Sequence, residues 1–311
     1  MNLKRTMTVA SLMVLVVFLV GCTLPLRATP TPFVFPTPNL KMTALFNPTL
    51  IIPPTVTPQP EGGVTQQATS PVATATSGAA TATSTAKVTV TPTSLPDTRA
   101  GTTIKALYVS TAPTIDGTWD EWDATAYPAK YVVFGKSNWT GSDDLEGSFR
   151  IAWDSKYLYV AAKVIDDTYV QIAADQYIYK GDSIEILLDT NVKGDFTSDV
   201  LSSDDYQLGI SAGDTGVKSL AYLWYPSGSA GTRTDVKIAG VRSSGVYRIE
   251  AAIPWSVFGV SSPTAGTHYG FAFSVSDDDQ KGKQSQDTMV SSVSNRVLVD
   301  PTTWGDLLLT K

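Results

Sequence analysis

Short segments of alternating apolar and polar residues, rich in β-branched and aromatic side chains, fill the chain from about residue 105 onward. The segments 149–153 and 157–164 flank a short polar turn and predict two strands of a hairpin. No window of ten or more residues shows the apolar i, i+3, i+4 spacing of an amphipathic helix. The sequence therefore predicts an all-β domain, an antiparallel β-sandwich of the immunoglobulin-like or jelly-roll type. The other predicted strands are 183–188, 206–210, 220–224, 236–241, 247–253, 270–276 and 307–310.

Acidic side chains outnumber basic ones in this domain. Residues 101–311 contain 17 Lys and Arg against 27 Asp and Glu, whereas residues 1–100 contain 6 against 2. Because binding to phosphates requires a basic surface, we expect no nucleic-acid partner. At roughly 200 residues the domain is long enough to bury a core without disulfides or metals, and we expect it to be monomeric.

The first 22 residues have the composition of an export signal. Lys4 and Arg5 precede an apolar run that ends in Leu-Val-Gly-Cys at Cys22, the only cysteine of the chain. A basic start, a short apolar run and small residues before the cut are typical of a secretory signal peptide. The ending resembles the lipobox of bacterial lipoproteins, in which the cysteine receives a diacylglyceryl group. We predict a signal peptide over 1–21 and a lipid anchor at Cys22, which places the protein on the outer side of the cell membrane. An ordinary signal peptide or an uncleaved anchor helix is the alternative.

A segment rich in threonine and proline follows. Residues 23–100 contain 19 Thr and 13 Pro and only two acidic residues. Such a composition cannot bury enough apolar surface to offset the entropy of ordering the chain. The sequence predicts a disordered linker over 22–104 that spaces a folded domain, 105–311, from the membrane. A disordered tail without a spacing role is the alternative.

Five stretches of the domain carry recognisable motifs. They are IDG followed by DEW at 115–122, AWD followed by YLYV at 152–160, DSIEI at 182–186, IEAAIPW and GFAFSVSD at 249–277, and DP followed by GDL at 300–307. Together they resemble the family 9 carbohydrate-binding modules, which are known as appendages of xylanases and other glycan-degrading enzymes. The resemblance implies an antiparallel β-sandwich, and it implies a non-catalytic surface lipoprotein that binds polysaccharide or oligosaccharide in carbohydrate catabolism.

The sugar contacts of that family are only partly kept. In the family two tryptophans clamp a terminal sugar ring, and their positions correspond to Tyr179 and Leu298. The family's arginine corresponds to Gly209 and its glutamine to Ser274. A leucine cannot stack on a sugar as an aromatic ring does, so the second half of the clamp is missing.

Three residues still match the family's contacts: Tyr179 as a stacking ring, with Glu185 and Asn295 as hydrogen-bonding partners. The resemblance therefore implies weak glycan binding, in the micromolar-to-millimolar range, through these three residues. Other aromatic residues in turn-rich stretches can rebuild a stacking platform. They are Trp139, Tyr177, Trp224 and Tyr225.

Aspartate is abundant in the domain, with 23 Asp against four Glu. The family is known for structural calcium, and calcium prefers six to eight hard oxygen ligands. The candidate ligands are Asp277, Asp278 and Asp279, and Asp195 with Asp199 is a second possibility. Ordinary solvated turns are the alternative.

Two other functions remain open for the same sandwich. One is a surface interaction or adhesion domain without a sugar ligand. The other follows from a related sandwich group that binds haem, for which only His268 and Met289 can serve beyond the linker. We expect no catalytic activity, because glycoside hydrolysis needs two facing carboxylates and a Ser–His–Asp triad would have to use His268.

Overall fold

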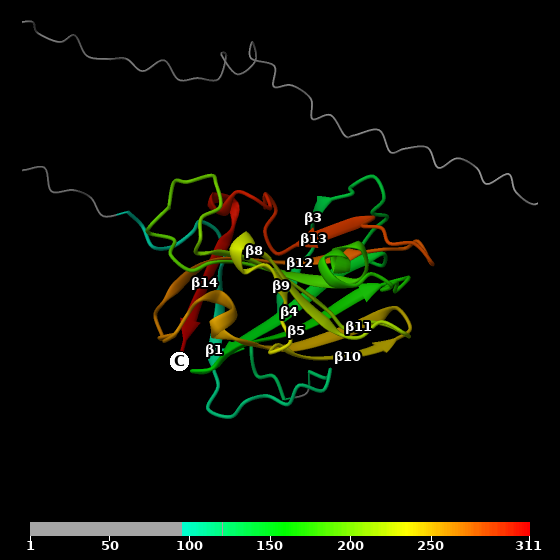
Figure 1. Cartoon of the computed structure of the whole chain (residues 1–311), viewed down its shortest axis with the longest axis horizontal. Coiled ribbons are helices and arrows are strands. Elements are labelled where there is room, and N and C mark those ends of the chain that lie inside the picture. The colour runs from blue at the N-terminus through cyan, green and yellow to red at the C-terminus, as the bar shows by residue number, and fades with distance from the viewer. Residues whose placement is uncertain (1–94, 120) are drawn as a thin grey trace, which may run out of the picture. The chain divides into compact units, whose positions relative to one another are not determined.

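Fourteen β-strands and four short 3-10 helices make up the part of the chain described by the computed structural model, residues 95–119 and 121–311. The predicted signal peptide, Cys22 and the linker up to residue 94 lie outside the described residues. The all-β prediction is confirmed, and the arrangement is that of a jelly-roll-type sandwich (Figure 1). Within the described residues, no helix has the length and apolar character needed to cross a membrane.

One layer of the sandwich contains the hairpin that the sequence predicts. Its strands, in spatial order, are β10 (Lys237–Ser243), β11 (Val246–Pro254), β5 (Tyr157–Asp166) and β4 (Leu145–Trp153), with β2 (Tyr127–Ala129) also paired to β4. In β4 and β5 apolar side chains enter the core at every second position, as the alternating sequence dictates.

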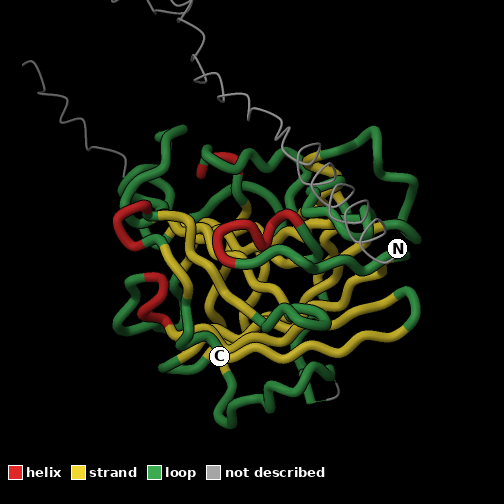
Figure 2. The backbone as a smooth tube through the Cα atoms, turned by 45° about the vertical axis from the view of Figure 1, so that its right-hand side comes forward, coloured by secondary structure: helices red, strands yellow, loops and turns green. Residues whose placement is uncertain are grey.

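The other layer lies on the opposite side of the core. Its order is β14 (Gly305–Thr310), β12 (His268–Asp277), β6 (Ser183–Asp189), β7 (Asp205–Ser211), β8 (Leu220–Tyr225) and β9 (Gly231–Thr232). The short strands β13 (Thr288–Ser291) and β3 (Tyr131–Phe134) extend it from β12. The helices η1 (Asp175–Lys180), η2 (Ser227–Ser229), η3 (Trp255–Phe258) and η4 (Pro301–Thr303) lie outside the strand layers (Figure 2).

The two layers share one apolar core. Phe149 of β4 stacks on Phe273 of β12 with 4.3 Å between ring centroids, and both rings are fully buried. The strand β1 (Thr103–Tyr108) links the layers because it pairs in parallel with both β4 and β14. All nine predicted strands are present, whereas β1, β2, β3, β9 and β13 were not predicted.

The IDG motif closes the outer face of the first layer. The carboxylate of Glu250 on β11 accepts hydrogen bonds from the backbone N–H groups of Asp116 (2.9 Å) and Gly117 (2.8 Å) and from the indole of Trp122 (2.7 Å). Gly117 has a φ of +92°, where a side chain would be strained and would press on Val241. These contacts attach the motif to β11, so it stabilises the fold.

Candidate functional site

A pocket of about 580 Å³ lies on the outer face of the second layer. The alternation of β6 explains its position. Ile184 and Ile186 point into the core, so Glu185 between them points outward. The lining residues are Val133, Phe134, Tyr179, Glu185, Gln207, Trp224, Gln286, Met289, Arg296, Val297 and Leu298.

A buried ion pair contributes the polar lining of the pocket. The Glu185 carboxylate pairs with the Arg296 guanidinium, and only 6% and 7% of these side chains are exposed. The other carboxylate oxygen accepts a hydrogen bond from Nε2 of Gln207 at 2.8 Å. Ser274 lies opposite Glu185 in the β6–β12 register and is fully buried. The arrangement provides fixed, directional donors and acceptors next to the cavity.

Arg296 was not predicted from the sequence. The family's arginine position is Gly209, and Arg296 reaches Glu185 from the loop after β13, 111 residues along the chain. Nothing in the local sequence around Arg296 indicates this pairing, because only the folded loop brings the two residues together.

An aromatic wall flanks this polar lining. Trp224 of β8 and Tyr179 of η1 meet edge to face, with 6.0 Å between centroids and an interplanar angle of 74°. The indole Nε1 of Trp224 donates to the backbone oxygen of Gln176 at 2.9 Å, which fixes the ring. A side chain at Gly209 would collide with the indole ring. The glycine therefore makes room for Trp224, so an aromatic ring occupies the space that a side chain at this position would fill.

Apolar side chains complete the lining. Phe134 of β3 is 50% exposed, and Val297 and Leu298 are 47% and 36% exposed. Leu298 thus lines the pocket at the position of the family's second tryptophan. Phe134 offers an accessible ring that the sequence analysis did not single out.

The structure brings together Tyr179 and Glu185 of the three predicted sugar contacts. Asn295 lines a different pocket of about 420 Å³. Of the four additional aromatic candidates only Trp224 lines the first pocket. Trp139 instead packs against the core, Tyr225 donates to the backbone oxygen of Leu201, and Tyr177 is 46% exposed outside either pocket.

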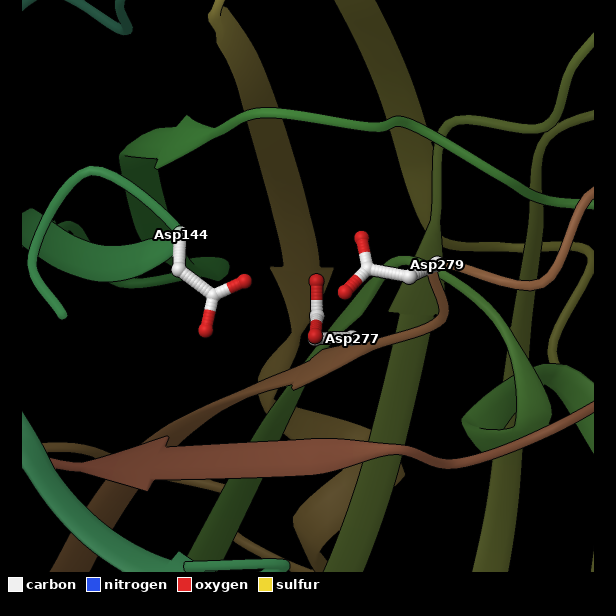
Figure 3. Close-up of side chains that lie close together, drawn as sticks. All are labelled: Asp144, Asp277 and Asp279. Carbon is white, nitrogen blue, oxygen red and sulfur yellow. The ribbon is translucent and has the colours of Figure 1, made fainter. Parts of the chain in front are cut away.

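Aspartates, most of them buried, converge at one end of the sandwich. Carboxylate oxygens of Asp144, Asp277 and Asp279 lie within 4.8 Å of one another (Figure 3). Carboxylate oxygens of Asp166, Asp182 and Asp277 also lie within 4.8 Å of one another. One oxygen each of Asp166, Asp182 and Asp277 is buried without a hydrogen-bond partner. Unpartnered buried oxygens that face each other are the ligands a hard cation requires, so these residues fit calcium. We call this set the aspartate cluster.

The electrostatics of the aspartate cluster are consistent with that fit. Burial, with repulsion from neighbouring carboxylates, raises the pKa of Asp277 to about 8. The same causes raise the pKa of Asp166 and of Asp279 to about 6. Asp278, the middle residue of the predicted triplet, points elsewhere and accepts from the backbone N–H groups of Gln280 and Ser285.

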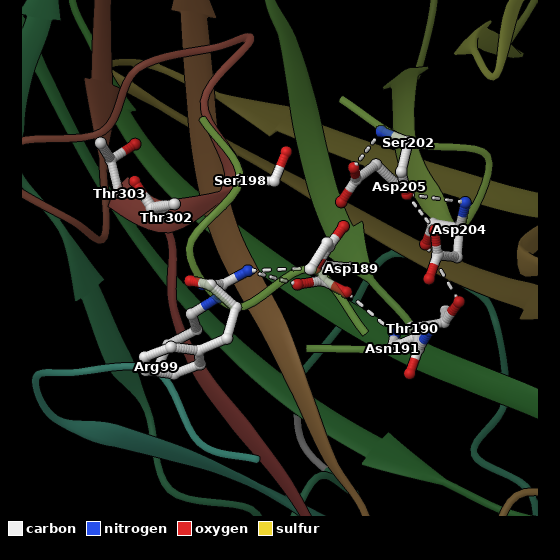
Figure 4. Close-up of polar contacts among 12 residues, drawn as sticks. Arg99, Asp189, Thr190, Asn191, Ser198, Ser202, Asp204, Asp205, Thr302 and Thr303 are labelled. Atoms are coloured by element: carbon white, nitrogen blue, oxygen red, sulfur yellow. Dashed lines mark hydrogen bonds and ion pairs between the residues drawn. The ribbon is translucent and has the colours of Figure 1, made fainter. Parts of the chain in front are cut away.

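A second acidic group is paired with an arginine side chain. Asp189, Asp195 and Asp205 lie within 4.8 Å of one another, and the Arg99 guanidinium contacts Asp189 at 2.8 Å and Asp195 at 3.6 Å (Figure 4). Arg99 also donates to the backbone oxygen of Phe196 at 2.6 Å. Asp195 therefore belongs to this group, whereas Asp199 is not part of it.

The two haem candidates lie far apart. His268 begins β12 and its Nδ1 is 2.9 Å from Asp306 Oδ1, while Met289 pairs in register with Ser276 near the other end of β12. Eight strand residues separate these positions by about 26 Å, so the two side chains do not meet at one iron.

Comparisons with known proteins point to one family. A family model described as "Carbohydrate family 9 binding domain-like" matches residues 115–311. The sequence is 30% identical over 200 residues to "Exoglucanase XynX" of Acetivibrio thermocellus, and 29% identical over 215 residues to "Endo-1,4-beta-xylanase A" of Thermotoga maritima. These matches cover 64% and 67% of this chain but only 16% and 18% of those relatives.

Solved structures agree with the fold. A family 9 module from Caldicellulosiruptor kristjanssonii in complex with cellotriose matches with a TM-score of 0.51 and 22% identity, over 67% of this chain and 94% of that one. The same kind of module in complex with glucose matches with a TM-score of 0.50 and 22% identity, over 66% and 95%. At this identity the similarity concerns the fold alone.

Proposed function

The chain belongs to the carbohydrate family 9 binding domain-like family, and we propose that its pocket on the second layer binds a neutral oligosaccharide or polysaccharide. One observation carries this proposal. The pocket combines half-buried aromatic rings, Trp224 and Tyr179, with the paired polar groups of Glu185, Arg296 and Gln207. Sugars need both features, since their C–H faces stack on rings while their hydroxyls need hydrogen-bonding partners.

The polar groups of the pocket supply both hydrogen-bond acceptors and donors. The Glu185 carboxylate accepts hydrogen bonds from sugar hydroxyls, and the guanidinium of Arg296 donates to hydroxyl oxygens. Their pairing holds both groups in place before a sugar arrives, which lowers the entropic cost of binding. With a single aromatic wall and few polar groups, we expect dissociation constants between micromolar and millimolar.

Titration of the full chain with cello- and xylo-oligosaccharides tests the proposal. The relatives include xylanases, and the structural neighbours hold cellotriose and glucose, so these two series are the first probes. We propose further that the chain itself is not catalytic. In support, the one carboxylate of the pocket lining, Glu185, is paired with Arg296 and thus unsuited to act as a free acid or base.

We propose that the aspartate cluster holds a structural calcium ion. Its members come from the turn before β4, the end of β5, the residue before β6, the end of β12 and the loop after it, so an ion there would tie both layers together. Asp144, Asp166, Asp182, Asp277 and Asp279 would supply the oxygens.

Millimolar calcium is expected to raise the melting temperature of the full chain above its value in chelator. A ligand at 100 times its dissociation constant stabilises the folded state by about 2.7 kcal/mol, or roughly 5–10 °C for a domain of this size. Asp277→Asn should remove this dependence, and Asp278→Asn, in the same loop but outside the aspartate cluster, should keep it. Equal melting temperatures of the unmutated chain in chelator and calcium would rule the ion out.

We also propose that Cys22 carries a lipid anchor, on the strength of the Leu-Val-Gly-Cys ending and the lack of any other cysteine. Cys22→Ser is expected to shift the protein from the membrane fraction to the soluble fraction, or to leave it unprocessed, because no thiol remains to be acylated. Fractionation and mass spectrometry of the N-terminus measure this. A Cys22→Ser chain that is still processed and membrane-bound would contradict the anchor.

A further inference from the structure

A second pocket lies beside the first and has no charged side chain in its lining. Its volume is about 420 Å³, and it is formed by the start of β1, by β2 and β3, and by the loop between β13 and β14. All of its lining residues are uncharged, and many carry a hydroxyl or an amide. Such a lining offers no charged side chain to balance a phosphate or a metal ion, whereas its hydroxyl and amide groups suit a neutral polyhydroxylated ligand.

The groups that face this pocket match sugar chemistry. Tyr131 is 43% exposed and offers an accessible ring for stacking. Asn295 is exposed, and its amide both donates and accepts. The Tyr127 hydroxyl accepts a hydrogen bond from the backbone of Lys105 at 2.9 Å and keeps its own proton for another partner. A stacking ring, an amide and a hydroxyl thus line one cavity.

The two pockets share their walls. Strand β3 contributes Tyr131 to the second pocket and Val133 to the first. Residues two apart on a strand point to the same face and lie about 7 Å apart, a distance that a short oligosaccharide spans. The loop after β13 also contributes to both pockets, because Asn295 lines the second pocket and the next residue, Arg296, lines the first.

We propose that the pocket of Tyr131 and Asn295 is a second subsite for the same glycan chain, so that the preferred ligand is a longer oligosaccharide or a stretch of polysaccharide rather than a single sugar. This inference rests on the proposed function. Asn295 then contacts a sugar unit different from the one held by Tyr179 and Glu185.

The test is a chain-length series on the full chain. Glucose through cellohexaose and xylose through xylohexaose are titrated by calorimetry against the unmutated protein, Tyr131→Ala and Asn295→Ala. We expect affinity to rise about tenfold from the shortest ligand that binds to the hexaose, and Tyr131→Ala to remove that gain while leaving the shortest ligand unchanged. Tyr177→Ala, an exposed tyrosine outside both pockets, is the matched control and should behave like the unmutated chain.

The outcomes separate this inference from the proposed function. Binding that does not depend on chain length overturns the second subsite alone, as does a gain that survives in both Tyr131→Ala and Asn295→Ala. Failure of every sugar to bind overturns the proposed function and the subsite with it. Melting curves of the variants confirm that each is folded before its affinity is compared.

Discussion

Replacing Trp224 with alanine is expected to lower the affinity for every bound glycan by about 100-fold or more. For a glycan that the unmutated chain binds with a millimolar dissociation constant, binding to the variant would no longer be measurable. The indole is the largest ring in the pocket and stacks edge to face on Tyr179. Its removal deletes a stacking surface and also releases the contact that holds the Tyr179 ring. Calorimetric titration with the best-bound oligosaccharide measures the effect.

Two tyrosines on the same short helix provide matched variants for this prediction. Tyr179→Ala should weaken binding about tenfold or more, whereas Tyr179→Phe should keep most of it because the ring remains. Tyr177, two residues earlier, lies outside the pocket, so Tyr177→Ala should leave binding unchanged. Equal affinities for Trp224→Ala and the unmutated chain would show that sugar binds elsewhere.

Replacing Arg99 with methionine is expected to lower the free energy of unfolding by about 3–5 kcal/mol. The guanidinium is the partner of Asp189, and the two side chains are 2% and 0% exposed. Without Arg99, Asp189 is left as an uncompensated buried carboxylate beside Asp195 and Asp205. Denaturant titration of the full chain measures the loss.

A surface ion pair supplies the control. Arg242 contacts Asp214 at 2.6 Å, but their side chains are 41% and 26% exposed. Water screens such a pair, so Arg242→Met should cost no more than about 1 kcal/mol. If Arg99→Met costs as little as Arg242→Met, the buried pair does not stabilise the domain.

Arg99 also bears on where the domain begins. The sequence assigns residues up to 104 to the linker on composition, yet Arg99 is buried and β1 starts at Thr103. The partners of Arg99 lie 90 residues or more further along the chain, so composition alone cannot reveal this contact. Within the stretch that the sequence assigns to the linker, residues 95–104 therefore contain contacts with the folded domain, through Arg99 and the start of β1.

The strands were predictable where local alternation dictates them. β4 and β5 alternate over nine and ten residues, and their hairpin turn is polar. The strands that were missed are mostly short, such as β9 with two residues and β2 with three, one of them a proline. β1 is longer, but its pairing is parallel to both neighbours and depends on strands distant in sequence. Local patterns do not encode such pairing.

The candidate site was predictable only in part, for a similar reason. Tyr179 and Glu185 were found because they lie next to the DSIEI motif. Trp224 was one aromatic candidate among several, and only the cavity left by Gly209 shows why it matters. In the aspartate cluster the run 277–279 suggested three adjacent ligands, but neighbouring side chains point in different directions and the cluster draws its other members from distant turns.

Titration of the full chain with cello- and xylo-oligosaccharides, followed by tryptophan fluorescence and calorimetry, tests the central claim most directly. The account predicts saturable binding with a dissociation constant between micromolar and millimolar, a fluorescence change that is lost in Trp224→Ala, and recovery of the oligosaccharide uncleaved. A flat titration with every sugar up to about 10 millimolar ligand would contradict the account. This concentration exceeds the highest dissociation constant predicted for the pocket of Trp224, Tyr179 and Glu185.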